Sequence, residues 1–131
     1  MKLRDYLAET RGRGVLATAS ADGRVDAAIY SRPHVSEDGT VAFIMRQRLT
    51  HSNLQSNPYA VYLFMEEEAG FRGLRLFLKK IGEDQNPELL ERMTRRHLSP
   101  AEDEARGPKW IVYFRIEKAL ALIGGETIQV K

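Results

Sequence analysis

Short apolar runs separated by tight turns dominate the first half of the chain. Residues 15–20 and residues 24–31 are each predicted to form a strand, and the turn Ala-Asp-Gly at 21–23 joins them. Asp-Gly between two such runs is a strong signal of a β-hairpin. A second Asp-Gly turn, at 36–39, leads into an apolar run at 41–45, which predicts a third strand.

The second half of the chain predicts three further strands. Residues 59–65 are apolar at consecutive positions, which favours a central strand covered on both faces. Residues 74–78 alternate between apolar and polar positions, and residues 110–116 form the last strong strand pattern. A weaker apolar run at 119–123 is a candidate for an added edge strand.

Helical signals lie at the start of the chain and in its middle. Residues 2–11 carry Leu3 and Leu7 on one face of a predicted amphipathic helix. A short helix is predicted over residues 51–56, with Thr50 as its N-cap, because a threonine oxygen accepts a backbone N–H of the first turn.

A third helix is predicted between the last two strands. Asn86 is a good cap and Pro87 suits the first helical position, so we expect a helix that runs to about Leu98. Residues 99–109 are charged and contain two prolines and a glycine, which predicts a surface loop.

These patterns predict one domain over residues 1–131, mainly β with helices. Six short strands joined by tight turns favour an antiparallel sheet closed into a barrel. The alternating strand–helix units of a parallel fold are absent from the pattern, and so is a Gly-x-Gly-x-x-Gly sequence.

Composition narrows the function. Twenty Lys and Arg stand against 18 Asp and Glu, so the net charge of +2 gives no broad basic field for a nucleic-acid backbone. There is no cysteine, which excludes disulfides, thiolate metal sites and cysteine nucleophiles. No apolar segment resembles a signal peptide or reaches the length of a membrane span, so we expect a cytoplasmic protein that does not act at membranes.

The segment of residues 44–58 carries the clearest chemical signal. A predicted strand leads to Arg46 and Arg48, and a helix begins directly after them. A helix N-terminus attracts anions, and an arginine fork suits phosphate oxygens. Thr50 and Ser52 add hydroxyl groups, so the segment predicts a phosphomonoester site. The alternative is that both arginines lie on a solvated loop and Thr50 is only a cap.

The order of these elements resembles the FMN-binding split-barrel family of pyridoxamine 5′-phosphate oxidase-like proteins. The likeness covers residues 1–80 best, and its most specific part is Asn53-Leu54-x-x-Asn57-Pro58 with the polar loop before it. The resemblance implies a six-stranded antiparallel split β-barrel of FMN-binding type. It also implies a homodimer with FMN at the interface.

The resemblance further implies which residues hold the cofactor. Arg46, Arg48 and Thr50 match the positions of phosphate contacts, and Asn53 belongs to the helix that follows. Ser31 and Arg32 match positions near the ribityl chain and the flavin ring. Met45 and Gln47 approach the ring edge through their backbone. The full set is Ser31, Arg32, Met45, Arg46, Gln47, Arg48, Thr50 and Asn53.

Two departures from the family pattern bear on the activity. The lysine that many members carry in this loop is absent, so arginine must supply its charge. The C-terminal substrate-binding segment of the pyridoxamine-phosphate oxidases is also absent, so oxidation of vitamin B6 itself is not expected.

The sequence leaves the activity open between two classes. One is a flavoprotein, either a small FMN-dependent oxidoreductase of unknown substrate or an electron carrier, with no catalytic residue assigned. The other is a small β-barrel module for single-stranded nucleic acid, which the near-neutral charge disfavours.

Arg32 and the histidines complete the predictions. Positive charge from Arg32 near the flavin would raise its reduction potential, whereas pairing with Glu37 would leave it no redox role. His34, His51 and His97 lack the spacing of metal ligands, so no metal site is predicted. We expect His51 to be solvated in the first turn of its helix.

Overall fold

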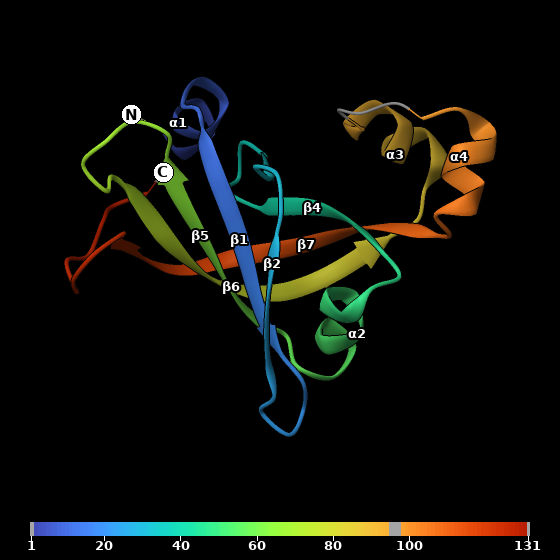
Figure 1. Ribbon diagram of the computed structural model, residues 1–131, viewed down its shortest axis with the longest axis horizontal. Helices are drawn as coiled ribbons and strands as arrows, with labels where there is room; N and C mark the ends of the chain where they lie inside the picture. Colours follow the sequence, from blue (N-terminus) through green and yellow to red (C-terminus); the bar gives the residue numbers. More distant parts are fainter. Residues whose placement is uncertain (1, 95–97, 131) are drawn as a thin grey trace.

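The computed structural model describes residues 2–94 and 98–130, and its centre is a seven-stranded antiparallel sheet. The strands follow the order β2-β1-β5-β6-β7-β4-β3, and the sheet curls around a buried core (Figure 1). The elements along the chain are α1 (Leu3–Glu9), β1 (Gly12–Ala19), β2 (Val25–Ile29), β3 (His34–Val35), β4 (Val41–Arg46), α2 (Leu49–Ser56), β5 (Tyr59–Glu66), β6 (Gly73–Asp84), α3 (Pro87–Met93), α4 (Pro100–Ala105) and β7 (Lys109–Ala121).

The predicted fold class is confirmed, with seven strands in place of six. The added strand is β3, two residues long, which pairs with the start of β4. It was missed because two residues are too short to show an alternating pattern. The two runs predicted at 110–116 and 119–123 form one strand, β7, because β6 is nearly as long and pairs with it on both sides of a register shift.

Aromatic side chains join opposite parts of the curled sheet. Phe43 on β4 lies 5.1 Å from Tyr62 on β5 and 5.8 Å from Phe114 on β7, measured between ring centroids. All three side chains are almost fully buried. β5 pairs with β1 on one side and β6 on the other, which confirms the central strand predicted at 59–65.

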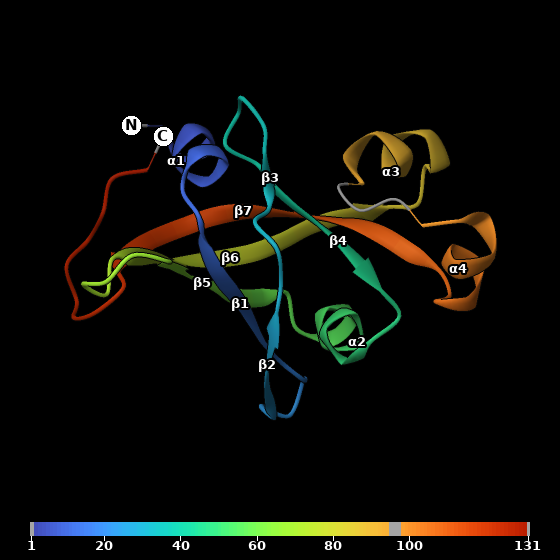
Figure 2. The same ribbon diagram turned by 45° about the horizontal axis from the view of Figure 1, so that its top comes forward.

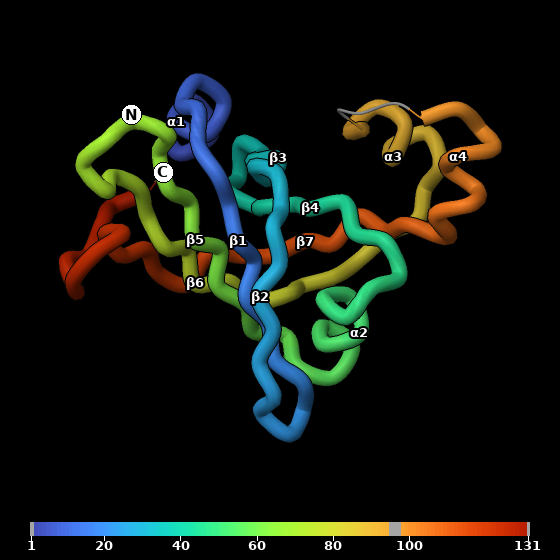
Figure 3. The backbone as a smooth tube through the Cα atoms, in the orientation of Figure 1, coloured from blue at the N-terminus to red at the C-terminus, as the bar shows by residue number. Residues whose placement is uncertain are grey.

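The sheet does not close by hydrogen bonds. Its two outer strands are β2 and β3, and the chain between them, residues 30–33, turns from one edge of the sheet to the other (Figure 3). Beyond Ala42, the side of β4 that faces away from β7 has no strand partner among the described residues. The barrel is therefore split between β2 and β4.

The first turn of α2 differs from its prediction. The helix begins at Leu49, and its N-cap is Arg48, whose side chain makes no cap bond. Thr50 was predicted as the N-cap and instead lies inside the helix, buried against the barrel. The helix starts earlier because Arg48 holds the extended backbone conformation that precedes a first turn.

The segment between β6 and β7 contains two helices rather than one. Asn86 caps α3 and Pro87 is its first residue, as predicted, but α3 ends at Met93, where the Thr94 hydroxyl bonds to the Leu90 carbonyl (2.6 Å). The surface loop predicted at 99–109 is wrong over its first half. Ser99 and Glu102 form a reciprocal capping box that starts α4.

The helices lie outside the sheet. Figure 2 shows α3 and α4 beside the ends of β4, β6 and β7, with α2 on the other side of β4. Within residues 2–94 and 98–130, no helix has the length and apolar character of a membrane span.

Gly14 on β1 supplies the first testable prediction. A Cβ at this position would overlap the hydroxyl group of Tyr62, which donates to the Tyr30 carbonyl (3.2 Å) at the end of β2. Gly14→Ala should therefore lower the free energy of unfolding by about 1–3 kcal/mol, as overpacking usually does. Chemical denaturation measures this change.

Gly82→Ala is the matched control for this prediction. A Cβ at Gly82 on β6 meets no atom within 4 Å. Its effect on stability should stay within about 1 kcal/mol. Equal losses in the two variants would contradict the close approach of Tyr62 to Gly14.

Candidate functional site

The split between β2 and β4 opens into two adjoining cavities. One, of about 490 Å³, reaches the first turn of α2 and is called the α2 cavity. The other, of about 340 Å³, reaches the ends of α3 and α4 and is called the α4 cavity. They are neighbours because both are lined by Ile29, Tyr30, Ile44, Arg46 and Arg106. The two together form the split cleft.

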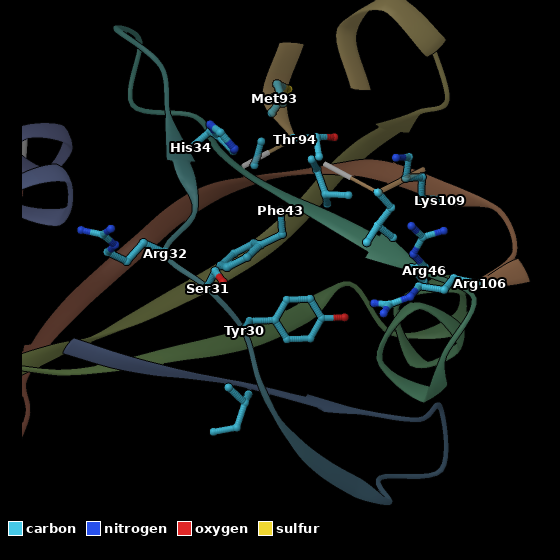
Figure 4. A pocket seen from close by; sticks show the side chains of 14 residues that line it. Tyr30, Ser31, Arg32, His34, Phe43, Arg46, Met93, Thr94, Arg106 and Lys109 are labelled. Carbon is cyan, nitrogen blue, oxygen red and sulfur yellow. The ribbon is translucent and has the colours of Figure 1, made fainter. Parts of the chain in front are cut away.

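Tyr30 stands at the centre of the split cleft. Its ring packs edge-on against Phe43, and its hydroxyl points to the end of the cavity where Arg46 and Arg106 lie (Figure 4). Burial raises the pKa of Tyr30, while a hydrogen bond with the Thr50 hydroxyl and the charge of Arg48 act against that rise. Sequence reasoning missed Tyr30, although it directly precedes the predicted pair Ser31 and Arg32.

The first turn of α2 borders the α2 cavity and has backbone N–H groups without helix bonds. The N–H of Ser52 bonds to the Arg48 carbonyl (3.0 Å), so the N–H groups of the three preceding residues start the helix without such a bond. Leu49 and Thr50 line the cavity together with Arg48, which is exposed. Among the described residues, the Arg48 guanidinium bonds only to the Gln47 carbonyl (3.3 Å). One carboxylate, Asp26, also lines this cavity.

Arg46 is held by α4 and by the segment that follows it. Its guanidinium donates to Asp103 Oδ1 (2.6 Å), to the Asp103 carbonyl (3.2 Å) and to the Gly107 carbonyl (2.7 Å). Lys109 Nζ lies 3.1 Å from the same Asp103 oxygen. Hydrogen bonds from Arg46 and Lys109 hold the pKa of the Asp103 carboxyl below its ordinary value. Arg46 therefore lines the cleft with its donors already engaged.

Arg32 is also engaged, at the opposite end of the cleft. Its guanidinium donates to the carbonyls of Leu7 (2.7 Å), Ala8 (3.3 Å) and Thr10 (3.2 Å) and so satisfies the C-terminal end of α1. Ser31 and Arg32 line the α4 cavity, but the guanidinium points out of it (Figure 4). The structure thus does not bring the Arg32 charge into the cavity, and the bonds found among the described residues include none between Arg32 and Glu37.

Three of the expected cofactor residues do not line either cavity. The Met45 side chain is buried in the core, and Gln47 is exposed beyond the end of β4. Asn53 is buried, and its amide donates to the Thr18 hydroxyl (3.0 Å) on β1. The five that do line the split cleft are Ser31, Arg32, Arg46, Arg48 and Thr50.

The expectation that His51 is solvated is wrong. Its ring is 7% exposed and stacks on Trp110, with 3.9 Å between ring centroids. His51 Nε2 lies 3.3 Å from a Glu83 carboxylate oxygen. The ring is buried because it stacks on Trp110 of β7 and lies against Glu83 of β6. His97 lies outside the described residues, and the rest of the chain brings together no group of three His, Asp or Glu side chains fit for a metal ion.

No protein-family model and no curated protein sequence matches the chain. Solved structures do match. An FMN-binding protein from Syntrophomonas wolfei subsp. wolfei superimposes with a TM-score of 0.74 at 20% identity, over 94% of this chain and 85% of that one. An F420 reductase gives a TM-score of 0.69 at 18% identity, over 91% of this chain and 97% of that one.

A third match is a provisionally named pyridoxamine 5′-phosphate oxidase from Lactobacillus delbrueckii. It gives a TM-score of 0.68 at 11% identity, over 92% of this chain and 93% of that one. The matched lengths include the helices as well as the sheet. The chain therefore has the split-barrel fold of the FMN-binding family that its sequence resembles.

Proposed function

We propose that this protein is a cytoplasmic homodimeric flavoprotein that binds FMN in the split cleft and acts as a small oxidoreductase. The observation that carries the proposal is the first turn of α2, which opens into a cavity beside the exposed Arg48. The similarity to the FMN-binding protein of Syntrophomonas supports the choice of ligand. The similarity to the F420 reductase makes a deazaflavin the alternative cofactor to FMN.

The residues of the α2 cavity fit a phosphate group. Backbone N–H groups at the start of α2 and the fork of Arg48 are both donors to phosphate oxygens. Thr50, whose hydroxyl bonds with Tyr30, lines the same space. Arg46 would contribute its charge from the wall, because its own donors are held by Asp103 and Gly107.

The boundary between the two cavities fits a flat aromatic ring. Ile29 and Ile44 supply apolar walls, and Tyr30 offers both a ring and a hydroxyl. Ser31 and the backbone of Arg32 lie further along the α4 cavity. When bound, the isoalloxazine ring supplies the hydride or electron chemistry, and this chain's residues bind and orient it.

The α4 cavity favours an enzyme over a pure electron carrier. Its volume of about 340 Å³ lies beyond the residues assigned to the phosphate end. A volume of this order is enough for a small molecule. A carrier has no use for a second ligand site, whereas an oxidoreductase requires one.

A second copy of the chain is proposed to cover the outer side of β2. Val25 is 84% exposed and Ile29 is 77% exposed, both on this outer strand. Leu49, at the start of α2, is 59% exposed and lines the α2 cavity together with Ile29. Covering these side chains would shield the cofactor and bury apolar surface in one step.

The phosphate assignment is tested by comparing FMN with riboflavin. Arg48→Gln should weaken FMN binding about tenfold or more, because it removes a charge-assisted bond to phosphate, and should leave riboflavin binding unchanged. Flavin fluorescence quenching measures both affinities. Arg24→Gln, on the exposed β1–β2 turn, is the control and should bind FMN as the native protein does. Equal affinity of the native protein for FMN and riboflavin would refute the assignment.

The dimer is tested by light scattering with and without FMN. The native protein should have twice the mass of the chain, and Ile29→Asp should be monomeric and bind FMN about tenfold more weakly, because a charge replaces a buried apolar contact. Ile81→Asp changes an equally apolar residue that is 53% exposed on β6, outside the split cleft, and should stay dimeric. A native monomer with full FMN affinity would contradict the dimer.

A further inference from the structure

The α4 cavity has a one-sided charge. Its described lining residues include five basic side chains and no carboxylate; the basic ones are Arg32, His34, Arg46, Arg106 and Lys109. The chain as a whole has nearly balanced charge, with 20 Lys and Arg against 18 Asp and Glu, and three His in addition. The imbalance in the cavity is therefore local, and it favours an anion.

Most of these cations are already committed to protein groups. The Arg32 guanidinium bonds to the carbonyls at the end of α1. Arg46 and Lys109 share the carboxylate of Asp103, at 2.6 Å and 3.1 Å. A ligand would have to break these bonds to use any of the three, at the cost of leaving partners unsatisfied.

Arg106 differs from these three. Its side chain is exposed at the end of α4 and lines both cavities. Within the described residues, its guanidinium has neither a hydrogen bond nor an ion pair. The adjacent residue, Gly107, turns the chain at φ +82° and accepts a bond from Arg46 (2.7 Å), which fixes the backbone beside Arg106. The backbone beside Arg106 is thus fixed, while the donors of its guanidinium remain available.

The side chains around Arg106 indicate the polarity and size of the rest of the ligand. Four apolar side chains line the α4 cavity: Phe43 and Ile44 on β4, Met93 at the end of α3, and Leu98 in the segment after it. These side chains suit an apolar body. The cavity of about 340 Å³ limits that body to a small molecule.

We propose that the α4 cavity binds the substrate, a small organic anion with a carboxylate or phosphate monoester on an apolar body, and that Arg106 recognises its charge. This rests on the proposed function, because it assigns the α2 end of the split cleft to FMN. Arg106 is then a specificity-determining residue: it binds the anionic group and takes no part in the hydride or electron transfer. Its planar fork matches both carboxylate and phosphate oxygens.

The test titrates the FMN-loaded protein with benzoate, phenyl phosphate and neutral benzamide. Shifts in the flavin absorption spectrum report binding. The native protein should bind at least one anion about tenfold or more tightly than benzamide, and Arg106→Gln should abolish that preference, because one charge-assisted bond is lost. The stronger of the two anions distinguishes a carboxylate from a phosphate substrate. Arg92→Gln removes an exposed cation of α3 that lines neither cavity and should behave as the native protein does.

Separate outcomes overturn the proposal and the proposed function. An unchanged preference for anions in Arg106→Gln, or equal binding of benzoate, phenyl phosphate and benzamide to the native protein, overturns the role of Arg106. Loss of FMN affinity in Arg106→Gln with riboflavin affinity retained makes Arg106 a cofactor residue and also overturns it. If the native protein binds no flavin, the proposed function fails, and calorimetry of the flavin-free protein with the same probes still decides whether Arg106 binds anions.

Discussion

The split cleft depends on how the end of β2 is held. The Tyr30 N–H bonds to the Gly14 carbonyl (3.0 Å), and the Tyr30 carbonyl accepts from the Tyr62 hydroxyl (3.2 Å) deep in the barrel. With both backbone groups used inward, the chain leaves the sheet, and Pro33 has no N–H with which to resume a ladder. The barrel therefore stays open between β2 and β4, and the cavities follow from that opening.

A second constraint fixes the far wall of the cleft. Asp103 receives Arg46 from β4 and Lys109 from β7, so one carboxylate ties α4 to two strands. The contact is only partly screened, because both cations are mostly buried while Asp103 is 39% exposed. The charges of Arg46 and Lys109 thus hold α4 in place as a wall of the cleft. Contacts with a ligand then fall to neighbouring residues such as Tyr30 and Arg106.

Much of the fold could be predicted because its signals are local. Asp-Gly turns, the apolar run at 59–65 and the pair Asn86-Pro87 each act within a few residues, and the structure has the elements they predict. The resemblance also led to the correct fold. The contacts of the side chains in the site were harder to predict. The partners of Arg46 lie 57 and 61 positions away in the sequence, and those of Arg32 lie 22–25 positions away. Burial of His51 likewise arises from packing against a distant strand, which no local pattern encodes.

The segment between β6 and β7 has a consequence for how such a protein diversifies. Asp84 near its start pairs with Ile111 near its end, so residues 85–108 leave and rejoin the sheet at neighbouring points. The segment adds no strand to the barrel, yet it contributes Met93, Leu98 and Arg106 to the cleft. Its length and sequence can change without altering the strand ladder, provided that Leu90 and Asp103 keep their contacts with β4 and β7. The same barrel can therefore carry different versions of this segment, and each version would change which ligand the cleft recognises.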